Sequence, residues 1–343
     1  MGARHLVCLA ALACASPAYP GAGTGGGGPA DAGQARAPAS PDAPDPVALV
    51  SAMSEALREL DYEGTFVHMA QGHLSSMRIL HASGAGGELE RMSALDGEAR
   101  EVVRDHARVT CVFPASASVT VTPSKPRRAL PEIDASLATN PNYRVALAGP
   151  GRVAGRDAHV VRIEPVDALR YGYRFWIDAA TSMLLRSMLV DENGAALEEV
   201  MFTDIEYVDG IDPARFEIEP EARKSSWLEA EAPAPKASLA GAGRRIGFAA
   251  LPRGYEKLGE SYRAMPMAGG PVSHAMLSDG VVSVSVYVEH LPRAEQDRSV
   301  EGASRIGGVS AYGTSLEDGF VTVVGEVPAA TVRAIAGAVR LAD

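Results

Sequence analysis

The chain has 343 residues, of which 46% are hydrophobic, and its formal net charge at pH 7 is −11. This length suits two domains together with a leader and a linker. Because an acidic chain repels phosphate backbones, the composition argues against a nucleic-acid partner. It still allows a local basic patch that binds an acidic or anionic partner of another kind.

Residues 1–19 have the pattern of a secretory signal peptide. Arg4 and His5 make a positive start, and the apolar run Leu6–Ala15 is too short to span a bilayer as a helix. Ala13-Cys14-Ala15 fits a small-x-small cleavage site, with Ser16-Pro17-Ala18 as an alternative. Leu12 lies one position away from where a lipoprotein processing site at Cys14 would have its Leu. We therefore expect an exported, soluble chain without a lipid anchor.

A disordered segment is predicted for residues 20–45, which are nearly all Gly, Ala, Pro, Asp and Ser and offer little to bury. A helix is predicted directly after it, because Asp45 suits the N-cap and Pro46 suits the first helical position. One apolar stripe recurs at helical spacing and needs a surface to cover: Val47, Val50, Met53, Leu57 and Leu60.

That surface is predicted to be a sheet. Ten short runs of strand-forming residues follow, most of them separated by Gly or Asp-Gly clusters: Tyr62–Met69, Ser76–His81, Glu88–Ala94, Ala99–Asp105, Arg108–Phe113, Val119–Thr122, Ala158–Glu164, Tyr171–Ile177, Met183–Val190 and Leu197–Tyr207. The stretch between the sixth and seventh runs is polar. Since no helix-length segment separates most neighbours, the sheet is expected to be antiparallel, within a domain spanning residues 46–220.

A second, smaller α+β domain is predicted for residues 244–343, after an Ala/Pro/Glu/Lys-rich linker at 221–243. Val282, Val284, Val286 and Val288 alternate with polar residues, as in a strand with one buried face. Asp279-Gly280 and Asp318-Gly319 indicate hairpin turns, and Phe320–Val324 is the expected return strand. A closing helix is expected from Pro328, with an apolar side made by Val332, Ile335, Ala336 and Val339.

Catalytic and metal-binding signatures are missing from the sequence. It has no HExxH, no CxxC and no glycine-rich phosphate loop followed by Lys. Cys111 would be the one cysteine left after leader cleavage, and a nucleophile would need a base from His68, His81 or His106. The alternative is a small buried hydrophobe, which we favour because Cys111 shares strand parity with two apolar residues. No catalytic residue, metal or cofactor is predicted.

An apolar cavity is a further hypothesis, because both faces of the large sheet carry more apolar side chains than one helix can cover. Methionines are frequent there and adapt to irregular shapes such as acyl chains. An ordinary core is the alternative. Parity and apolarity select eight residues as candidate lining: Phe66, Met77, Ile79, Met92, Phe113, Tyr173, Phe175 and Met188.

Ten short blocks, in order along the chain, resemble the RseB/MucB family of sigma-E regulatory proteins. They are YEGTFVH at 62–68, SMRILH at 76–81, ERMSALDG at 90–97, REVVR at 100–104, VTCVFP at 109–114, YRFWID at 173–178, LLRS at 184–187, LPRGY at 251–255, SDGVVSVSVY at 278–287 and VGEVP at 324–328. The resemblance runs from about residue 47 to the C-terminus, and the segment at 20–45 has no counterpart in it.

The resemblance implies a periplasmic, non-enzymatic negative regulator. Its large domain would be an antiparallel half-barrel with helices on the concave side, like the lipoprotein carriers of the outer membrane. The smaller domain would help to bind the periplasmic domain of a membrane-spanning anti-sigma factor of the RseA/MucA kind, shielding it from regulated proteolysis. Lipopolysaccharide or a related acyl lipid would release it.

Tyr255, Tyr262 and Arg263 are our candidate partner contacts, because aromatic and Arg side chains dominate interface hot spots. Two other functions compete with the regulator: a lipid or lipoprotein carrier without a regulatory partner, and a cysteine hydrolase using Cys111. A homo-oligomer is a further association that the sequence leaves open.

Overall fold

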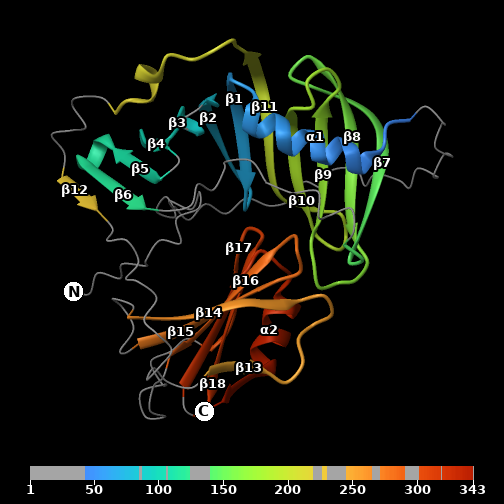
Figure 1. Ribbon diagram of the computed structural model, residues 1–343, viewed down its shortest axis with the longest axis vertical. Helices are drawn as coiled ribbons and strands as arrows, with labels where there is room; N and C mark the ends of the chain where they lie inside the picture. Colours follow the sequence, from blue (N-terminus) through green and yellow to red (C-terminus); the bar gives the residue numbers. More distant parts are fainter. Residues whose placement is uncertain are drawn as a thin grey trace, which may run out of the picture.

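The computed structural model describes residues 43–84, 87–105, 107–123, 140–218, 226–229, 245–264, 271–289, 301–317 and 319–342. Within these ranges the chain forms one large and one smaller sheet, each with an α-helix against it, and a separate two-stranded sheet (Figure 1). None of the helices in the described ranges is both long and apolar enough to cross a bilayer.

The large sheet has twelve strands in the order β12-β6-β5-β4-β3-β2-β1-β11-β10-β9-β8-β7. Every neighbouring pair is antiparallel except β12 with β6, which is parallel. The strands are β1 (Tyr62–Ala70), β2 (His73–Ala82), β3 (Leu89–Ala94), β4 (Glu101–Arg104), β5 (Arg108–Phe113), β6 (Ser118–Pro123), β7 (Tyr143–Val153), β8 (Arg156–Pro165), β9 (Gly172–Asp178), β10 (Leu184–Val190), β11 (Ala196–Tyr207) and β12 (Ser226–Glu229). The predicted antiparallel sheet is thus confirmed, with one parallel pair added at its edge.

Helix α1 (Pro46–Glu59) begins as the sequence predicts. The Asp45 side chain accepts a hydrogen bond from the backbone N–H of Val47, and Pro46 occupies the first turn. Val50, Met53 and Leu57 are at most 1% exposed and belong to the core of the large domain. The apolar stripe therefore covers the sheet as expected.

This helix covers only part of the sheet. It packs against β7 and β10, and Figure 1 shows it lying across the half formed by β1 and β7–β11. No α-helix of the described residues lies over β3–β6. Among the described residues, an α-helix therefore covers one half of the core face and not the other.

Strand β7 lies where the sequence analysis expected only a polar stretch. Its pattern is weak because Pro150 and two glycines interrupt it and the ladder shifts between Leu147 and Gly149. Proline is tolerated here because β7 is the edge strand of the sheet, where one row of N–H groups needs no partner. An edge position cannot be recognised from the chain alone.

Strand β12 is a second difference, because Ser226–Glu229 lies within the stretch expected to be linker. It pairs in parallel with β6, with Trp227 opposite Val119. The few strand-forming residues of this segment therefore extend the large sheet after the chain has left it.

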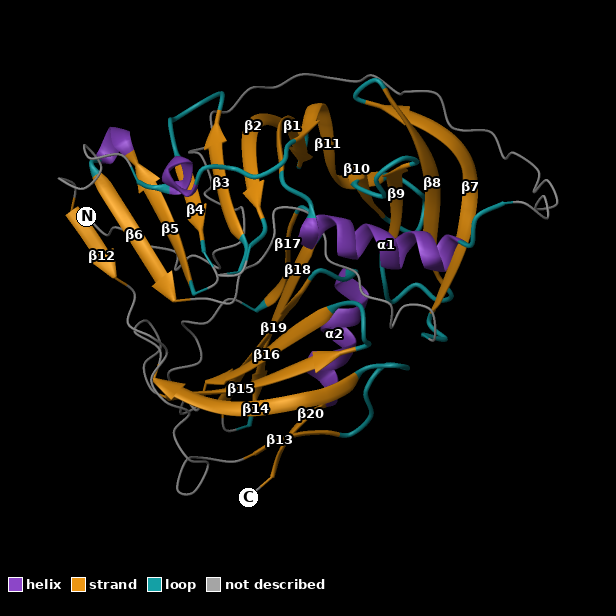
Figure 2. Cartoon of the chain, turned by 45° about the horizontal axis from the view of Figure 1, so that its top comes forward, coloured by secondary structure: helices purple, strands orange, loops and turns teal. Residues whose placement is uncertain are grey.

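The smaller sheet has the order β14-β15-β16-β19-β18-β17, and Figure 2 shows α2 (Ala329–Ala338) against one side of it. The strands are β14 (Glu256–Ala264), β15 (Pro271–Ser278), β16 (Ser283–Glu289), β17 (Gly302–Ile306), β18 (Val309–Leu316) and β19 (Gly319–Gly325), and β13 (Arg245–Phe248) pairs separately with β20 (Val339–Ala342). Val284, Val286 and Val288 are fully buried, as their alternation predicted. Val332, Ile335 and Ala336 are the buried side of α2.

Asp178, at the end of β9, is a buried carboxylate that ties three segments together. It is 2% exposed, accepts hydrogen bonds from the Tyr207 hydroxyl and the Ala180 N–H at 2.9 Å, and forms an ion pair with Arg156. Burial alone would raise the pKa of this carboxyl, but the hydrogen bonds from Arg156, the Ala180 N–H and Tyr207, together with the Arg156 charge, outweigh burial and lower the pKa.

A lowered folded-state pKa makes Asp178 stabilising above its unfolded pKa of about 3.9, with loss of that contribution as pH falls through the folded value. We expect Asp178→Asn to lower the free energy of unfolding at pH 7 by about 1–3 kcal/mol relative to the wild-type protein. This difference between variant and wild type should be smaller near pH 3. Urea unfolding at both pH values measures this. Asp157→Asn, at an exposed neighbour, is the control. An equal difference in unfolding free energy at both pH values would contradict the lowered pKa of Asp178.

Candidate functional site

Six of the eight predicted cavity residues lie in one buried apolar cluster that includes α1. Their exposed fractions run from 0% to 7%, and the ring of Phe66 packs edge-on against Phe202 at 5.9 Å between centroids. The six are Phe66, Met77, Ile79, Met92, Tyr173 and Phe175. The sequence analysis thus found the core face of the large sheet, and its use as a lipid cavity stays a prediction.

Met188 requires a correction, because it faces away from this cluster. In the ladders it lies opposite Arg174 and Glu199, whereas Tyr173 lies opposite Leu189. Directly opposed residues share a face, so Met188 is on the outer side of the sheet. Parity identifies the two faces within one strand but not which faces match across a hairpin.

Phe113 shares the core face but lies on its open half. The register runs from Ile79 through Met92 and Val102 to Cys111, two residues before Phe113 on β5. Ile79 and Met92 are buried, whereas the apolar members of this face on β4 and β5 are only half-buried. We call these four residues the open strip: Val102, Val109, Cys111 and Phe113.

The cysteine–histidine pairing is not assembled in the described residues. Cys111 is on β5, whereas His81 is on β2, with β3 and β4 between them. His68 is one strand further, where its Nε2 lies 2.7 Å from Glu198. His106 lies outside the described residues. Cys111 is also only half-buried, not the buried hydrophobe that we favoured.

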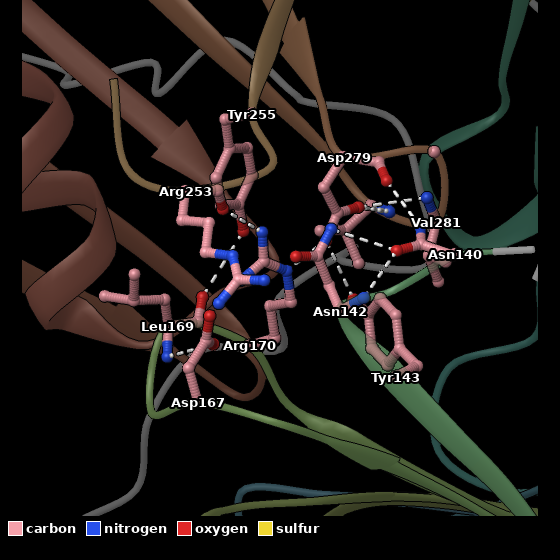
Figure 3. Close-up of polar contacts among 12 residues, drawn as sticks. Asn140, Asn142, Tyr143, Asp167, Leu169, Arg170, Arg253, Tyr255, Asp279 and Val281 are labelled. Carbon is pink, nitrogen blue, oxygen red and sulfur yellow. Dashed lines mark hydrogen bonds and ion pairs between the residues drawn. The ribbon is translucent and has the colours of Figure 1, made fainter. Parts of the chain in front are cut away.

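The two domains meet at a buried polar cluster around Arg170 and Asp279, shown in Figure 3. Both side chains are fully buried, and Arg170 Nε donates to the Asp279 carboxylate. The Arg170 guanidinium also donates to Asp167 at 2.6 Å and to the Arg253 carbonyl oxygen, and it stacks over the Tyr255 ring at 4.7 Å.

Further hydrogen bonds surround this ion pair. The Tyr143 hydroxyl donates to Asp279 at 3.0 Å, and Asn140 donates to the Asp279 carbonyl oxygen at 2.6 Å. The Leu169 carbonyl oxygen accepts from the hydroxyls of Tyr255 and Thr331 at 3.3 and 2.8 Å. We call Asn140, Tyr143, Arg170, Tyr255 and Asp279 the junction cluster.

The two tyrosines and the arginine of the junction cluster keep their protonation states near neutral pH. Burial, followed by the nearby Asp279 charge, raises the pKa of the Tyr143 hydroxyl, and the same two causes raise the pKa of Tyr255. Burial opposes the charge on Arg170, but the hydrogen bonds to Asp279 and Asp167, together with the nearby Tyr255 and Asp279, outweigh burial and raise the pKa of the guanidinium. The neutral Tyr143 phenol therefore donates to the Arg170–Asp279 pair, and the neutral Tyr255 phenol donates to the Leu169 carbonyl oxygen beside it.

The predicted partner contacts fall in different environments. Tyr255 is 4% exposed and belongs to the junction cluster, so it joins the two domains and presents almost no surface to another protein. Tyr262 is half-buried on the edge strand β14. The side chain of Arg263 lies outside the described residues.

Sequence reasoning missed Arg170, Tyr143 and Asn140 and treated Asp279 only as a turn residue. The signal for Asp279 was real, because its side chain accepts from the N–H groups of Val281 and Val282 in the predicted turn. Its second oxygen is what reaches Arg170. Nothing in the local pattern indicates a partner 109 residues away. Within the described ranges, no group of three or more His, Cys, Asp or Glu could hold a metal ion.

Two family models match the chain, one for each domain. Residues 45–222 match the MucB/RseB N-terminal domain, and residues 244–340 match the MucB/RseB C-terminal domain. The chain belongs to the MucB/RseB family.

Curated relatives in this family are named as sigma-factor regulatory proteins. The sigma factor AlgU regulatory protein MucB of Pseudomonas aeruginosa is 31% identical over 84% of this chain and 88% of its own length. The sigma-E factor regulatory protein RseB of Escherichia coli K12 is 26% identical over the same shares. The match therefore extends across both domains of the MucB/RseB architecture.

Solved structures show the same arrangement. MucB in the Pseudomonas aeruginosa MucA/MucB complex is 27% identical, with a TM-score of 0.66 over 88% of this chain and all of that one. MucB crystallised by itself gives a TM-score of 0.59 at 25% identity. The predicted fold, a large antiparallel sheet domain followed by a smaller α+β domain, is confirmed.

We expect Arg170→Met to weaken the joint between the two MucB/RseB domains. Removing the arginine leaves the buried Asp279 charge uncompensated, which lowers the free energy of unfolding by about 3–5 kcal/mol. Denaturant unfolding followed by tryptophan fluorescence should show a lower midpoint or two separated transitions. Arg144→Met, at an exposed arginine on β7, is the control. Unchanged cooperative unfolding of Arg170→Met would contradict a stabilising role for the pair.

Proposed function

We propose that this MucB/RseB member is a periplasmic negative regulator of an envelope-stress sigma factor. It binds the periplasmic domain of a membrane-spanning anti-sigma factor and shields it from regulated proteolysis. Lipopolysaccharide or a related acyl lipid weakens that binding. The chain acts by covering a surface and performs no catalysis.

The match to MucB over both domains carries this proposal. All of the MucB chain in the complex with MucA aligns with this one, so both halves that are present in that complex are present here. A carrier would need only the large sheet, whereas the described smaller domain is tied to it by the junction cluster. This favours the regulator over a carrier without a regulatory partner.

The division of the large sheet supports a lipid-responsive step. The closed half is filled by α1 and the apolar cluster, and the open strip leaves apolar side chains half-exposed beside it. Exposed apolar surface of this kind is where acyl chains or partner side chains bind. Because linkage is reciprocal, a lipid that weakens anti-sigma binding is itself bound less tightly by the complex.

Calorimetry of the exported protein with the periplasmic domain of its cognate anti-sigma factor tests the proposal. We expect saturable binding that weakens about 5–150-fold when lipopolysaccharide is present, the range of a coupling of about 1–3 kcal/mol. Lipopolysaccharide binding without any binding of the anti-sigma domain would leave a lipid carrier.

We expect Cys111→Ser to keep full anti-sigma binding and full protection of the anti-sigma domain from its first protease. The reason is that β3 and β4 separate Cys111 from His81, and His68 lies one strand further. Digestion of the anti-sigma domain, followed by gel with and without the variant, measures this. Cleavage of the anti-sigma domain by the wild-type protein alone, abolished in a folded Cys111→Ser variant, would revive the hydrolase.

A further inference from the structure

Arg104, the last residue of β4, is a buried cation on an apolar face. It lies opposite Glu90 and Val109 in the ladders, on the same side of the sheet as Val102. The residue is 9% exposed. An arginine this deeply buried normally has acceptors for its N–H groups.

The guanidinium of Arg104 is incompletely satisfied. The Glu90 carboxylate lies 3.7 Å from Nη1, close enough to offset the charge but too far for a hydrogen bond. Nε and Nη1 are both buried and have no hydrogen-bond acceptor. Two buried donors without acceptors cost free energy that an oxygen-bearing ligand would recover.

The open strip begins at the ladder partner of Arg104 on β5. Val109 lies directly opposite Arg104, and Cys111 and Phe113 follow at alternate positions of β5 on the same face. The distance from Val109 to Phe113 along a strand is about 13 Å, which a medium-length acyl chain can span. A buried cation therefore lies at one end of a half-exposed apolar row.

We propose that Arg104 and the open strip bind an amphiphile with an anionic head group and an acyl chain. The carboxylate or phosphate oxygens of the head accept hydrogen bonds from Nε and Nη1 of Arg104, and the chain lies along Val109, Cys111 and Phe113. Arginine suits this task because its planar fork matches both anions. This inference deepens the lipid-responsive step of the proposed function by assigning its residues and head-group chemistry.

Decanoate, decan-1-ol and inorganic phosphate are suitable probes, because they separate the head from the chain. Calorimetry at pH 8 should show decanoate binding about tenfold or more tightly than decan-1-ol, as expected for a charge-assisted hydrogen bond. Inorganic phosphate should bind far more weakly than decanoate. Equal affinities for decanoate and decan-1-ol would overturn the head-group assignment, and phosphate binding as tight as decanoate would overturn the amphiphile.

Arg104→Met should abolish the preference for decanoate over decan-1-ol while keeping chain-dependent binding. Arg108→Met, which removes an exposed arginine of the next strand, is the matched control and should keep the preference. If Arg104→Met fails to fold because Glu90 loses its counter-charge, Arg104→Met combined with Glu90→Gln removes both charges. A preference that persists in a folded Arg104 variant would overturn the proposal.

The alkylation rate of Cys111 reports where a ligand binds as well as how tightly it binds. In the wild-type protein, decanoate should slow the reaction of Cys111 with iodoacetamide several-fold, because the chain covers the open strip. Binding of decanoate without protection of Cys111 would put the chain elsewhere and overturn the site.

These outcomes are separable from the anti-sigma experiment. Arg104-dependent decanoate binding together with no anti-sigma binding would leave the site standing and refute the regulator. Anti-sigma binding that is weakened by lipopolysaccharide, with unchanged head-group preference in Arg104→Met, would refute only the site.

Discussion

The buried ion pair between Arg170 and Asp279 is the interaction on which the two-domain arrangement depends. Both charges are removed from water, so their attraction offsets a desolvation cost only while the surrounding hydrogen bonds hold. Tyr143, Asn140 and Asp167 supply those bonds from the large domain, and the Arg253 carbonyl supplies one from the smaller domain. Such a cluster specifies one relative position of the domains, because any sliding leaves a buried charge uncompensated.

The second constraint is that one helix covers a twelve-stranded sheet. Helix α1 buries the face of β1 and β7–β11, and the apolar cluster is complete there. Beyond β3 the apolar side chains of the same face, Val102, Val109, Cys111 and Phe113, are only half-buried. A sheet of this length cannot be closed by a helix of 14 residues. The open strip is therefore a consequence of the short helix and the long sheet. Arg104 adds a buried positive charge at one end of it.

The candidate residues show which side-chain positions strand parity can predict and which it cannot. Phe66, Met77, Ile79 and Met92 are together on the core face because each strand alternates reliably. Met188 was placed on the wrong face because the alignment between β9 and β10 depends on their ladder and its shift near Arg186. Tyr255 was chosen as a partner contact because of its residue type, yet it is buried beneath Arg170 and joins the two domains.

The sequence by itself determined the local elements: the capped helix at Asp45 and Pro46, most strands of the large sheet, and the valine strand of the smaller domain. These depend on periodicity and capping, which act within a few residues. The tertiary structure alone decided that β7 is an edge strand able to hold Pro150, that Ser226–Glu229 joins the large sheet, and that Arg170 meets Asp279. These outcomes depend on contacts between residues far apart in the chain, and local patterns carry no record of which distant groups will be brought together.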